Sequence, residues 1–266
     1  MAADLIATSS NRAPVYDTIG LGYRRFRRPD PRIARQVHAA MGSAASVLNV
    51  GAGSGSYEPT DRPVVAVDPS LVQLRQRPPD AAPAIRGVAE HLPFADGSFA
   101  AALGVLTIHH WRDRAAGFRE LQRVARERVV LLTWYPTPEG FWLTRDYFPD
   151  MITYDLRIFP SMEQLASELG RITVQTVPIP WDCVDGFGGA YWHRPDAYLD
   201  PEVRGAMSTF TRLSNVEPRL ERLRQDLSSG RWHVANADLL NAESIDLGYR
   251  LVVCESAGYG APHSRA

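Results

Sequence analysis

Short apolar runs alternate with longer amphipathic segments over the first half of the chain. Four runs bounded by turn residues predict buried strands, at 46–50, 63–68, 99–108 and 128–134. Three further segments predict helices, at 30–41, 69–77 and 112–126. We expect the first helix to begin with Asp30 as its N-cap and Pro31 at its first position. Strands that alternate with helices are typical of a parallel sheet covered by helices.

The alternation loosens after residue 134. A helix is predicted at 161–170, where Gly170 ends it, and strands are predicted at 172–180 and 249–256. A polar and aromatic insertion with several expected helices, residues 181–246, separates these two strands. The predicted fold class is therefore α/β, a Rossmann-like, mostly parallel sheet with helices on both faces and a mainly helical insertion or lid near the C-terminal part.

The composition narrows the functional classes. The chain has 266 residues, 45% of them apolar, and a formal net charge of -1, which fits a globular protein that does not bind nucleic acid. Cys183 and Cys254 lie far apart and without histidines at ligand spacing, so neither a disulfide framework nor a metal site is expected. Neither a signal peptide nor a run of roughly 20 apolar residues is recognisable. We expect a cytoplasmic monomer or homodimer with no membrane partner.

The stretch SVLNVGAGSGSYEPTDRPVVAVDPS, residues 46–70, carries the clearest chemical signal. Three glycines follow its first predicted strand, Gly51, Gly53 and Gly55. Because glycine has no Cβ, the backbone of such a loop can approach a ligand closely. Asp68 ends the next strand, where a carboxylate can accept hydrogen bonds from ribose hydroxyls. A dinucleotide loop would have Gly or Ala where Ser56 stands, so this loop favours an adenosine-bearing cofactor without a pyrophosphate.

The glycine loop and the acidic residue lie close together in the sequence. Gly51 and Asp68 are 17 positions apart, under the roughly 20 expected for this arrangement, and two prolines lie between them. We therefore expect the helix after the glycine loop to be cut to about one or two turns. Tyr57 would then face the binding pocket, or else pack at the edge of the sheet.

The chain resembles the class I S-adenosylmethionine-dependent methyltransferases in five ordered segments, VLNVGAGSG, VVAVDPS, AEHLPFADGSF, VLTIHHWRD and FRELQRVARERVVLLTW. It is most similar to the broad type 11 group, which includes ubiquinone and menaquinone biosynthesis enzymes, over residues 14–135. The resemblance implies transfer of a methyl group from S-adenosylmethionine to a small-molecule acceptor, with specialised metabolism as one setting. It leaves the acceptor, and whether its reacting atom is O, N or C, undetermined.

The resemblance also implies which residues bind the cofactor. They are Asn49, Gly51, Ala52, Gly53, Gly55, Asp68, Pro69, Ala89, Glu90, Leu106, Thr107 and Tyr16. Three positions depart from the family pattern, because Asn49, Val88 and Ala100 stand where acidic residues are usual. These departures affect individual contacts to the cofactor, whereas the glycines and Asp68 keep the family pattern.

Candidate catalytic residues come from the chemistry of methyl transfer, which needs orientation, desolvation and, for a hydroxyl or an acidic carbon, a base. His109 and His110 follow a predicted strand and are candidate bases, because imidazole titrates near neutral pH. In members of the family that the chain resembles, a histidine pair at this place is often structural instead. Both roles stay open at this point.

The insertion is expected to select the acceptor. Together with Tyr57, the predicted acceptor-binding residues are Trp181, Phe187, Tyr191 and Trp192. A plain packing role suits these aromatics equally well, since a helical cap needs its own core. Four parts are expected: an N-terminal segment that closes over the cofactor site, the cofactor-binding core, the acceptor-side insertion, and the last core strand with the tail, at 1–30, 31–180, 181–246 and 247–266.

Two other functional classes remain compatible with this pattern. One is an S-adenosylmethionine-binding protein that has lost methyl transfer or uses the cofactor for another reaction. The other is a nicotinamide-dependent oxidoreductase on the same topology, which Ser56 and the lack of a recognisable hydride-relay motif disfavour. A shared fold does not by itself decide between them.

Overall fold

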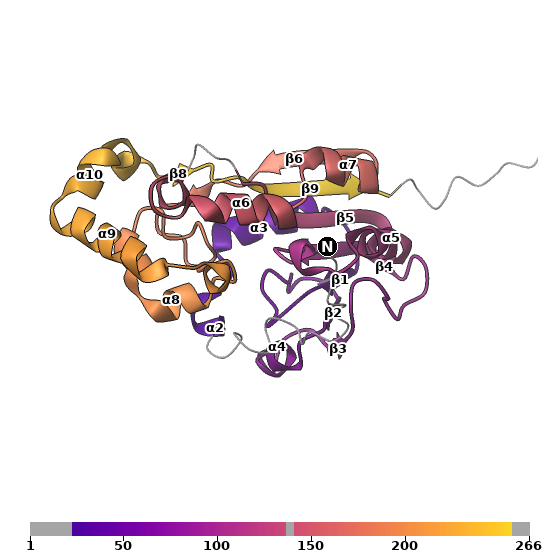
Figure 1. Cartoon of the computed structure of the whole chain (residues 1–266). Coiled ribbons are helices and arrows are strands. Elements are labelled where there is room, and N and C mark those ends of the chain that lie inside the picture. Colours follow the sequence, from indigo (N-terminus) through magenta and orange to yellow (C-terminus); the bar gives the residue numbers. More distant parts are fainter. Residues whose placement is uncertain (1–22, 137–140, 257–266) are drawn as a thin grey trace, which may run out of the picture.

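A seven-stranded sheet forms the centre of the protein (Figure 1). The computed structural model describes residues 23–136 and 141–256. The strands are β1 Val47–Val50, β2 Val64–Asp68, β3 Ala84–Arg86, β4 Phe99–Val105, β5 Ala125–Trp134, β6 Ile172–Thr176 and β9 Tyr249–Glu255, in the spatial order β3-β2-β1-β4-β5-β9-β6. The pairs among β1 to β5 are parallel, and β9 runs antiparallel to both β5 and β6. The predicted mostly parallel α/β sheet is confirmed.

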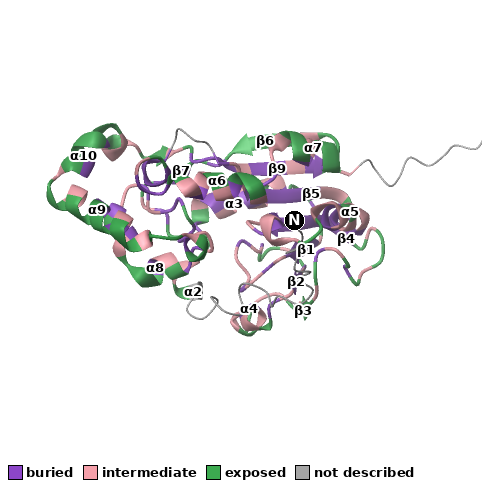
Figure 2. Ribbon diagram, in the orientation of Figure 1, coloured by how far each residue is buried: buried purple, intermediate pink, exposed green. Residues whose placement is uncertain are grey.

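Helices cover both faces of this sheet. On one face α3, Pro31–Ala40, packs against β5 and β9; on the other, α5, Arg114–Val124, and α7, Met162–Leu169, pack on β4 to β6. Successive side chains of a strand point to opposite faces, so Val130 belongs to the first core and Leu131 to the second. Strands that are buried on both faces need apolar residues at successive positions, which accounts for the continuous apolar runs in the sequence. Figure 2 shows this burial along β1, β4 and β5.

The predicted helix boundaries follow from local capping. Asp30 accepts a hydrogen bond from the backbone N–H of Arg32 at 2.9 Å and starts α3. Ser161 and Gln164 form a reciprocal capping box at the start of α7, which ends at Gly170 with a positive φ of 83°. The short helix α4, Leu71–Arg75, begins after Ser70, whose hydroxyl accepts from the backbone of Gln73. These helices were all predicted from the sequence.

Two local predictions need correction. Residues 51–62 form turns and contain no helix, so the predicted short helix after the glycine loop is wrong. The predicted strand at 172–180 divides in two, because only β6 joins the main sheet. Its continuation β7, Ile179–Pro180, pairs instead with β8, Ser244–Ile245. This two-stranded ladder joins the start of the insertion to its end.

A cap of short helices lies at one end of the sheet, away from α5 and α7 (Figure 1). The insertion contributes η3 Pro195–Leu199, α8 Pro201–Gly205, η4 Phe210–Arg212, α9 Val216–Ser228, α10 Arg231–Ala235 and η5 Ala237–Asn241. An earlier part of the chain also belongs to it, namely the π-helical turn η2, Leu143–Tyr147, and α6, Pro149–Ile158. The buried Trp142 donates from Nε1 to the carbonyl of Trp192 at 2.7 Å and joins the two segments.

The remaining described elements are short. The single-turn helix α2, Tyr23–Phe26, precedes α3, and the 3-10 turn η1, Ile108–His110, follows β4. Within the described parts of the chain, no helix combines the length and apolar character needed to span a bilayer. In the same residues no cluster of three or more His, Cys, Asp or Glu side chains is arranged to hold a metal ion.

Candidate active site

The larger of two adjoining cavities lies at the carboxyl ends of β1, β2 and β4. In an open parallel sheet this is where ligands bind, at the point where the strand order reverses. Ten predicted cofactor-binding residues line it, Asn49, Gly51, Ala52, Gly53, Asp68, Pro69, Ala89, Glu90, Leu106 and Thr107. Gly55 does not line it, although its neighbours Ser54 and Ser56 do, and Tyr16 lies outside the described residues.

The glycine loop is shaped by its own backbone. Gly51 and Gly53 have φ values of +70° and +52°, and a Cβ at Gly51 would overlap the side chain of Thr107. Asp68 binds the loop directly, since its Oδ2 accepts from the backbone N–H of Gly53 and its Oδ1 from that of Ser70, both at 2.8 Å. The carboxylate that is predicted to bind the ribose therefore also positions the loop.

A buried ion pair stands where a helix would otherwise follow the loop. Glu58 accepts from the guanidinium of Arg77 at 2.7 and 3.0 Å, and both side chains are buried. Asn49 donates from Nδ2 to the same carboxylate at 3.0 Å. An acidic residue at position 49 would face Glu58 with like charge, which explains why this chain has an amide there. The Oδ1 atom of Asn49 is buried in the cavity wall with no hydrogen-bond partner among the described residues.

Sequence reasoning missed Gln73, which lines the larger cavity from α4. The residue is 2% exposed, and both polar atoms of its side-chain amide lack a hydrogen-bond partner within the described part of the chain. Buried amides are normally satisfied, so an unsatisfied one in a cavity wall suggests a ligand contact. In the sequence, the one feature that could have indicated a ligand contact was the position of Gln73 in a predicted helix that begins shortly after Asp68. Polar residues near the start of a helix are common, so this feature was too weak to single out Gln73.

The smaller cavity lies between the sheet and the cap. Six aromatic side chains line it, Trp134, Phe141, Phe159, Phe187, Phe210 and Tyr249. Arg27 and Leu106 line both cavities and thus mark their common boundary. Leu106 has a φ of +47°, a costly conformation for a branched side chain that occurs mostly at functional positions. It follows β4, where the resemblance placed residues beside both cofactor and acceptor.

The two candidate bases line different cavities, although their ring centroids are 3.9 Å apart. His109 lines the smaller cavity and His110 the larger one. Burial, together with the neighbouring His110 and Arg27, holds the pKa of His109 well below its usual range; burial lowers that of His110 to about 4. The ring of His109 packs on Phe159 with 4.1 Å between centroids, and its Nδ1 has no hydrogen-bond partner in the described structure. Both imidazoles are neutral at neutral pH.

The predicted acceptor-binding aromatics divide between cavity and core. Phe187 lines the smaller cavity, but the other four do not. Trp181 is 46% exposed, and Trp192 is fully buried with its Nε1 donating to the carbonyl of Ile179 at 3.0 Å. Tyr191 packs under the guanidinium of Arg194, 4.8 Å from its ring centre. These three predictions need correction, because the cap uses the side chains for its own packing or leaves them at the surface.

Tyr57 is the fourth such residue and is buried in the core rather than the cavity wall. Its hydroxyl donates to Oδ2 of Asp185 at 2.8 Å, and its backbone has a φ of +63°. Asp185 is fully buried and accepts from Nε of Arg27 at 2.6 Å through its other oxygen. Since Arg27 lines both cavities, this network connects the insertion, the segment after the glycine loop and the cavity boundary. Sequence reasoning did not single out Arg27.

Comparisons with known proteins agree with this geometry. A family model described as a methyltransferase domain matches residues 48–133. Demethylmenaquinone methyltransferase from Mycolicibacterium vanbaalenii is 35% identical over 56% of this chain, which spans 64% of that relative's length, under two thirds. The enzyme of the same description from Roseiflexus sp. is 37% identical over 59% of this chain and 79% of its own length.

A crystal structure from Anabaena variabilis extends the comparison beyond the core. It is provisionally described as a methyltransferase from an antibiotic biosynthesis pathway, and it is 32% identical to this chain with a TM-score of 0.79. The match covers 86% of this chain and 98% of that one. Coverage of this extent cannot leave out the whole of the insertion, which therefore has a counterpart at least in part.

These findings define the class of the protein. It is an S-adenosylmethionine-dependent methyltransferase, as the five ordered segments predicted. The chain belongs to the class I family, its residues 48–133 form the type 11 methyltransferase domain, and its cofactor is S-adenosylmethionine. The nicotinamide-dependent alternative is wrong.

Proposed function

We propose that the protein methylates a small, largely apolar and ring-containing molecule that occupies the smaller cavity. The observation that carries this proposal is the common boundary of the two cavities at Arg27 and Leu106. A cofactor on the polar side of Leu106 and an acceptor on the aromatic side would meet there. Methyl transfer depends on such an in-line approach of two held reactants.

The polar groups of the larger cavity fit the cofactor. Asp68 would bind the ribose hydroxyls, and the backbone of Gly51 and Gly53 leaves room that a Cβ would fill. Oδ1 of Asn49 and the side-chain amide of Gln73, which have no partner among the described residues, offer hydrogen bonds to the cofactor. When bound, S-adenosylmethionine supplies an electrophilic methyl group on a sulfonium.

The protein's own contribution to the reaction is then mostly orientation and exclusion of water. Aromatic walls hold the acceptor and remove solvent from the boundary. His109 faces the acceptor side and can accept a hydrogen bond or a proton through its unpartnered Nδ1. Its low pKa makes it a weak base, so it would act on an acceptor that is itself acidic. His110 lines only the cofactor side, which favours a packing role for it.

A place in specialised metabolism is part of the proposal. The antibiotic-pathway relative matches 86% of this chain, whereas the two demethylmenaquinone methyltransferases match 56% and 59%. Because the cap selects the acceptor, a relative that shares part of the cap is the better guide to the kind of substrate. A quinone ring is a second candidate acceptor, supported by the two curated relatives.

Calorimetric titration with S-adenosylhomocysteine tests the cofactor half of the proposal. Asp68→Ala removes both the loop contact and the proposed ribose contact, and we expect at least tenfold weaker binding, about 1.4 kcal/mol. Glu127→Gln is the matched control, since Glu127 is partly exposed on β5 and lines neither cavity. Wild-type affinity in Asp68→Ala would contradict the placement of the cofactor.

Methyl transfer itself is tested with isotope-labelled S-adenosylmethionine and a panel of aromatic acceptors that includes a demethylated quinone. Once an acceptor is found, we expect His109→Ala to lower turnover about tenfold to hundredfold if that acceptor is acidic. We expect His110→Ala to leave turnover within about twofold. Equal turnover in both variants and the wild type would remove the proposed role of His109. Failure to label any aromatic acceptor would argue against the proposed substrate class.

A further inference from the structure

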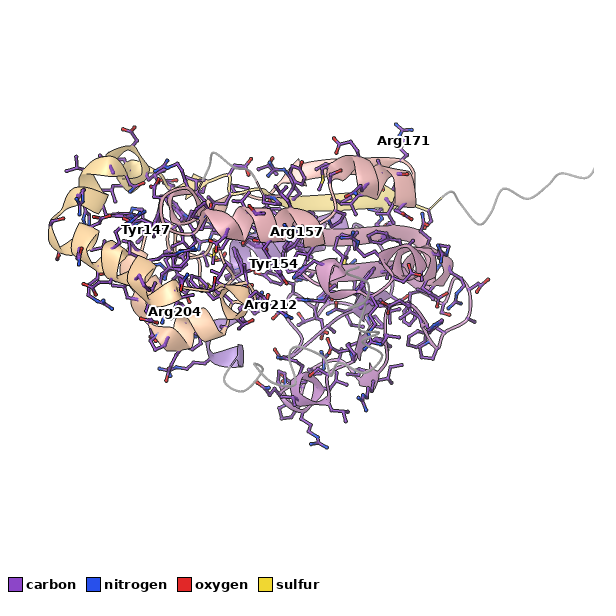
Figure 3. The ribbon with its side chains drawn as sticks, in the orientation of Figure 1. Tyr147, Tyr154, Arg157, Arg171, Arg204 and Arg212 are labelled. Atoms are coloured by element: carbon purple, nitrogen blue, oxygen red, sulfur yellow. The ribbon has the colours of Figure 1, made fainter. Side chains whose placement is uncertain are left out.

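Asp155 is a buried acid that has no counter-charge among the described residues. It lies on α6, its side chain lines the smaller cavity, and the residue is 1% exposed. Thr209 donates from Oγ1 to one of its oxygens at 3.3 Å, and no other side chain in the described residues hydrogen-bonds to it or pairs with it. In Figure 3 the helix α6, which carries Tyr154 and Arg157, runs above the segment that carries Arg212. Thr209 belongs to that segment.

Burial of such a carboxyl group is unfavourable in the ligand-free protein. A carboxylate moved from water into an apolar site needs a cation or several hydrogen bonds, and Thr209 supplies one bond. Burial accordingly raises the pKa of Asp155 to about 7. A cationic group of a ligand would provide the counter-charge that the described residues do not supply.

The rest of the cavity is suited to a cation as well. Its aromatic rings present faces and edges on several sides, and ammonium groups bind favourably against such rings. Arg27 is the other charged residue in the cavity wall, apart from the neutral His109. Its charge is compensated by Asp185 at 2.6 Å, so it opposes a ligand cation only weakly. Asp155 is the acid among the described lining residues of this cavity.

Building on the proposed function, we propose that the acceptor carries a basic amine and that Asp155, supported by Thr209, binds this amine in the aromatic cavity. The amine anchors the acceptor and is not the methylated atom. Asp155 lines the smaller cavity but not the larger one, whereas the reacting atom has to reach the boundary at Arg27 and Leu106. The substrate class is therefore an aromatic or cyclic amine that is methylated elsewhere on its frame.

Two probes of nearly equal shape separate a cation from a neutral polar group. We would titrate the protein, saturated with S-adenosylhomocysteine, with 2-phenylethylamine and with 2-phenylethanol. We expect the wild type to bind the amine at least tenfold more tightly than the alcohol. In Asp155→Asn the amine should bind at least tenfold more weakly and the alcohol about as well as before, because the amide keeps the shape and removes the charge.

Asp150→Asn is the matched control on the same helix. Asp150 lies in the first turn of α6, pairs with Arg219 and does not line the cavity, so its removal should leave both affinities unchanged. A wild type that binds the alcohol as tightly as the amine would overturn the proposal, and so would one that binds neither probe. An amine preference that survives in Asp155→Asn would overturn it too.

The same samples keep this proposal separate from the proposed function. Titration with S-adenosylhomocysteine alone reports the cofactor site, which Asp155 does not line. A wild type that shows no amine preference but binds S-adenosylhomocysteine would overturn the amine anchor and leave methyl transfer standing. If the wild type failed to bind S-adenosylhomocysteine, the proposed function would fall first.

Discussion

The two cavities of this protein are built in different ways. The larger one is lined mainly by strand ends, loops and the starts of helices between residues 49 and 119. The smaller one draws its wall from segments spread between residues 27 and 249, and most of these side chains are aromatic or aliphatic. The wall of the proposed cofactor cavity is thus mostly local in the sequence, whereas the wall of the proposed acceptor cavity depends on how distant segments pack.

Gly51→Ala would break the larger cavity and should have the largest effect. A Cβ there would overlap Thr107 and require a disfavoured positive φ, so we expect at least hundredfold weaker binding of S-adenosylhomocysteine, about 2.7 kcal/mol. Calorimetry on protein shown to be folded by circular dichroism measures it. Gly170→Ala is the control, because Gly170 also has a positive φ but open space around it. Equal cofactor affinity in both variants would show that the loop is not the cofactor site.

Asp155→Asn should change how the free energy of unfolding depends on pH, because it removes a buried carboxyl group from the wall of the smaller cavity. The carboxyl group has a folded pKa of about 7 against an ordinary 3.8, so the folded state holds the extra proton between these values. The stability contributed by this proton is present below pH 4 and is lost as the pH rises through 7. The two pKa values set an upper limit of about 4 kcal/mol, and we expect about half of it.

Chemical denaturation without ligand at pH 4.5 and pH 8 measures this effect. Asp155→Asn should be more stable than the wild type at pH 8 and nearly equal to it at pH 4.5. Arg27, His109 and Tyr249 are the other titratable residues in this cavity wall, and Arg27 stays charged throughout. Asp150→Asn should follow the wild type at both values. A constant difference between Asp155→Asn and the wild type would contradict the prediction.

Gln73→Leu should have the smallest effect of these variants. It tests whether the side-chain amide of Gln73 contacts the cofactor in the larger cavity. The change keeps the volume and removes two buried groups that lack partners in the described structure, so fold stability should not decrease. We expect affinity for S-adenosylhomocysteine to fall about tenfold, about 1.4 kcal/mol. Gln76→Leu, on the same segment but outside the cavity wall, is the control. Unchanged affinity in Gln73→Leu would mean that this amide does not contact the cofactor.

The sheet and the cofactor side were largely predictable, and specific residues show why. The strand that ends at Val50, the glycines after it and the Asp68 that closes the next strand lie within a short stretch, so their mutual positions follow from local geometry. The missing helix was not predictable, because the Glu58–Arg77 pair that stands in its place joins positions that no periodic pattern connects. Tyr57 was misplaced for the same reason, since its partner Asp185 belongs to the insertion.

The sequence by itself determined the class of the protein and its cofactor, and it named ten residues that line the larger cavity. Apolar periodicity and glycine spacing act over a few residues, and a strand followed by a turn has few possible geometries. Only the tertiary structure decided the wall of the proposed acceptor cavity. It brought Arg27 to the cavity boundary, buried Asp155 with no cation among the described residues beside it, and buried Trp192 in the cap. Whether an aromatic or acidic side chain faces a cavity or a core depends on contacts between segments far apart in the chain, and composition does not encode those contacts locally.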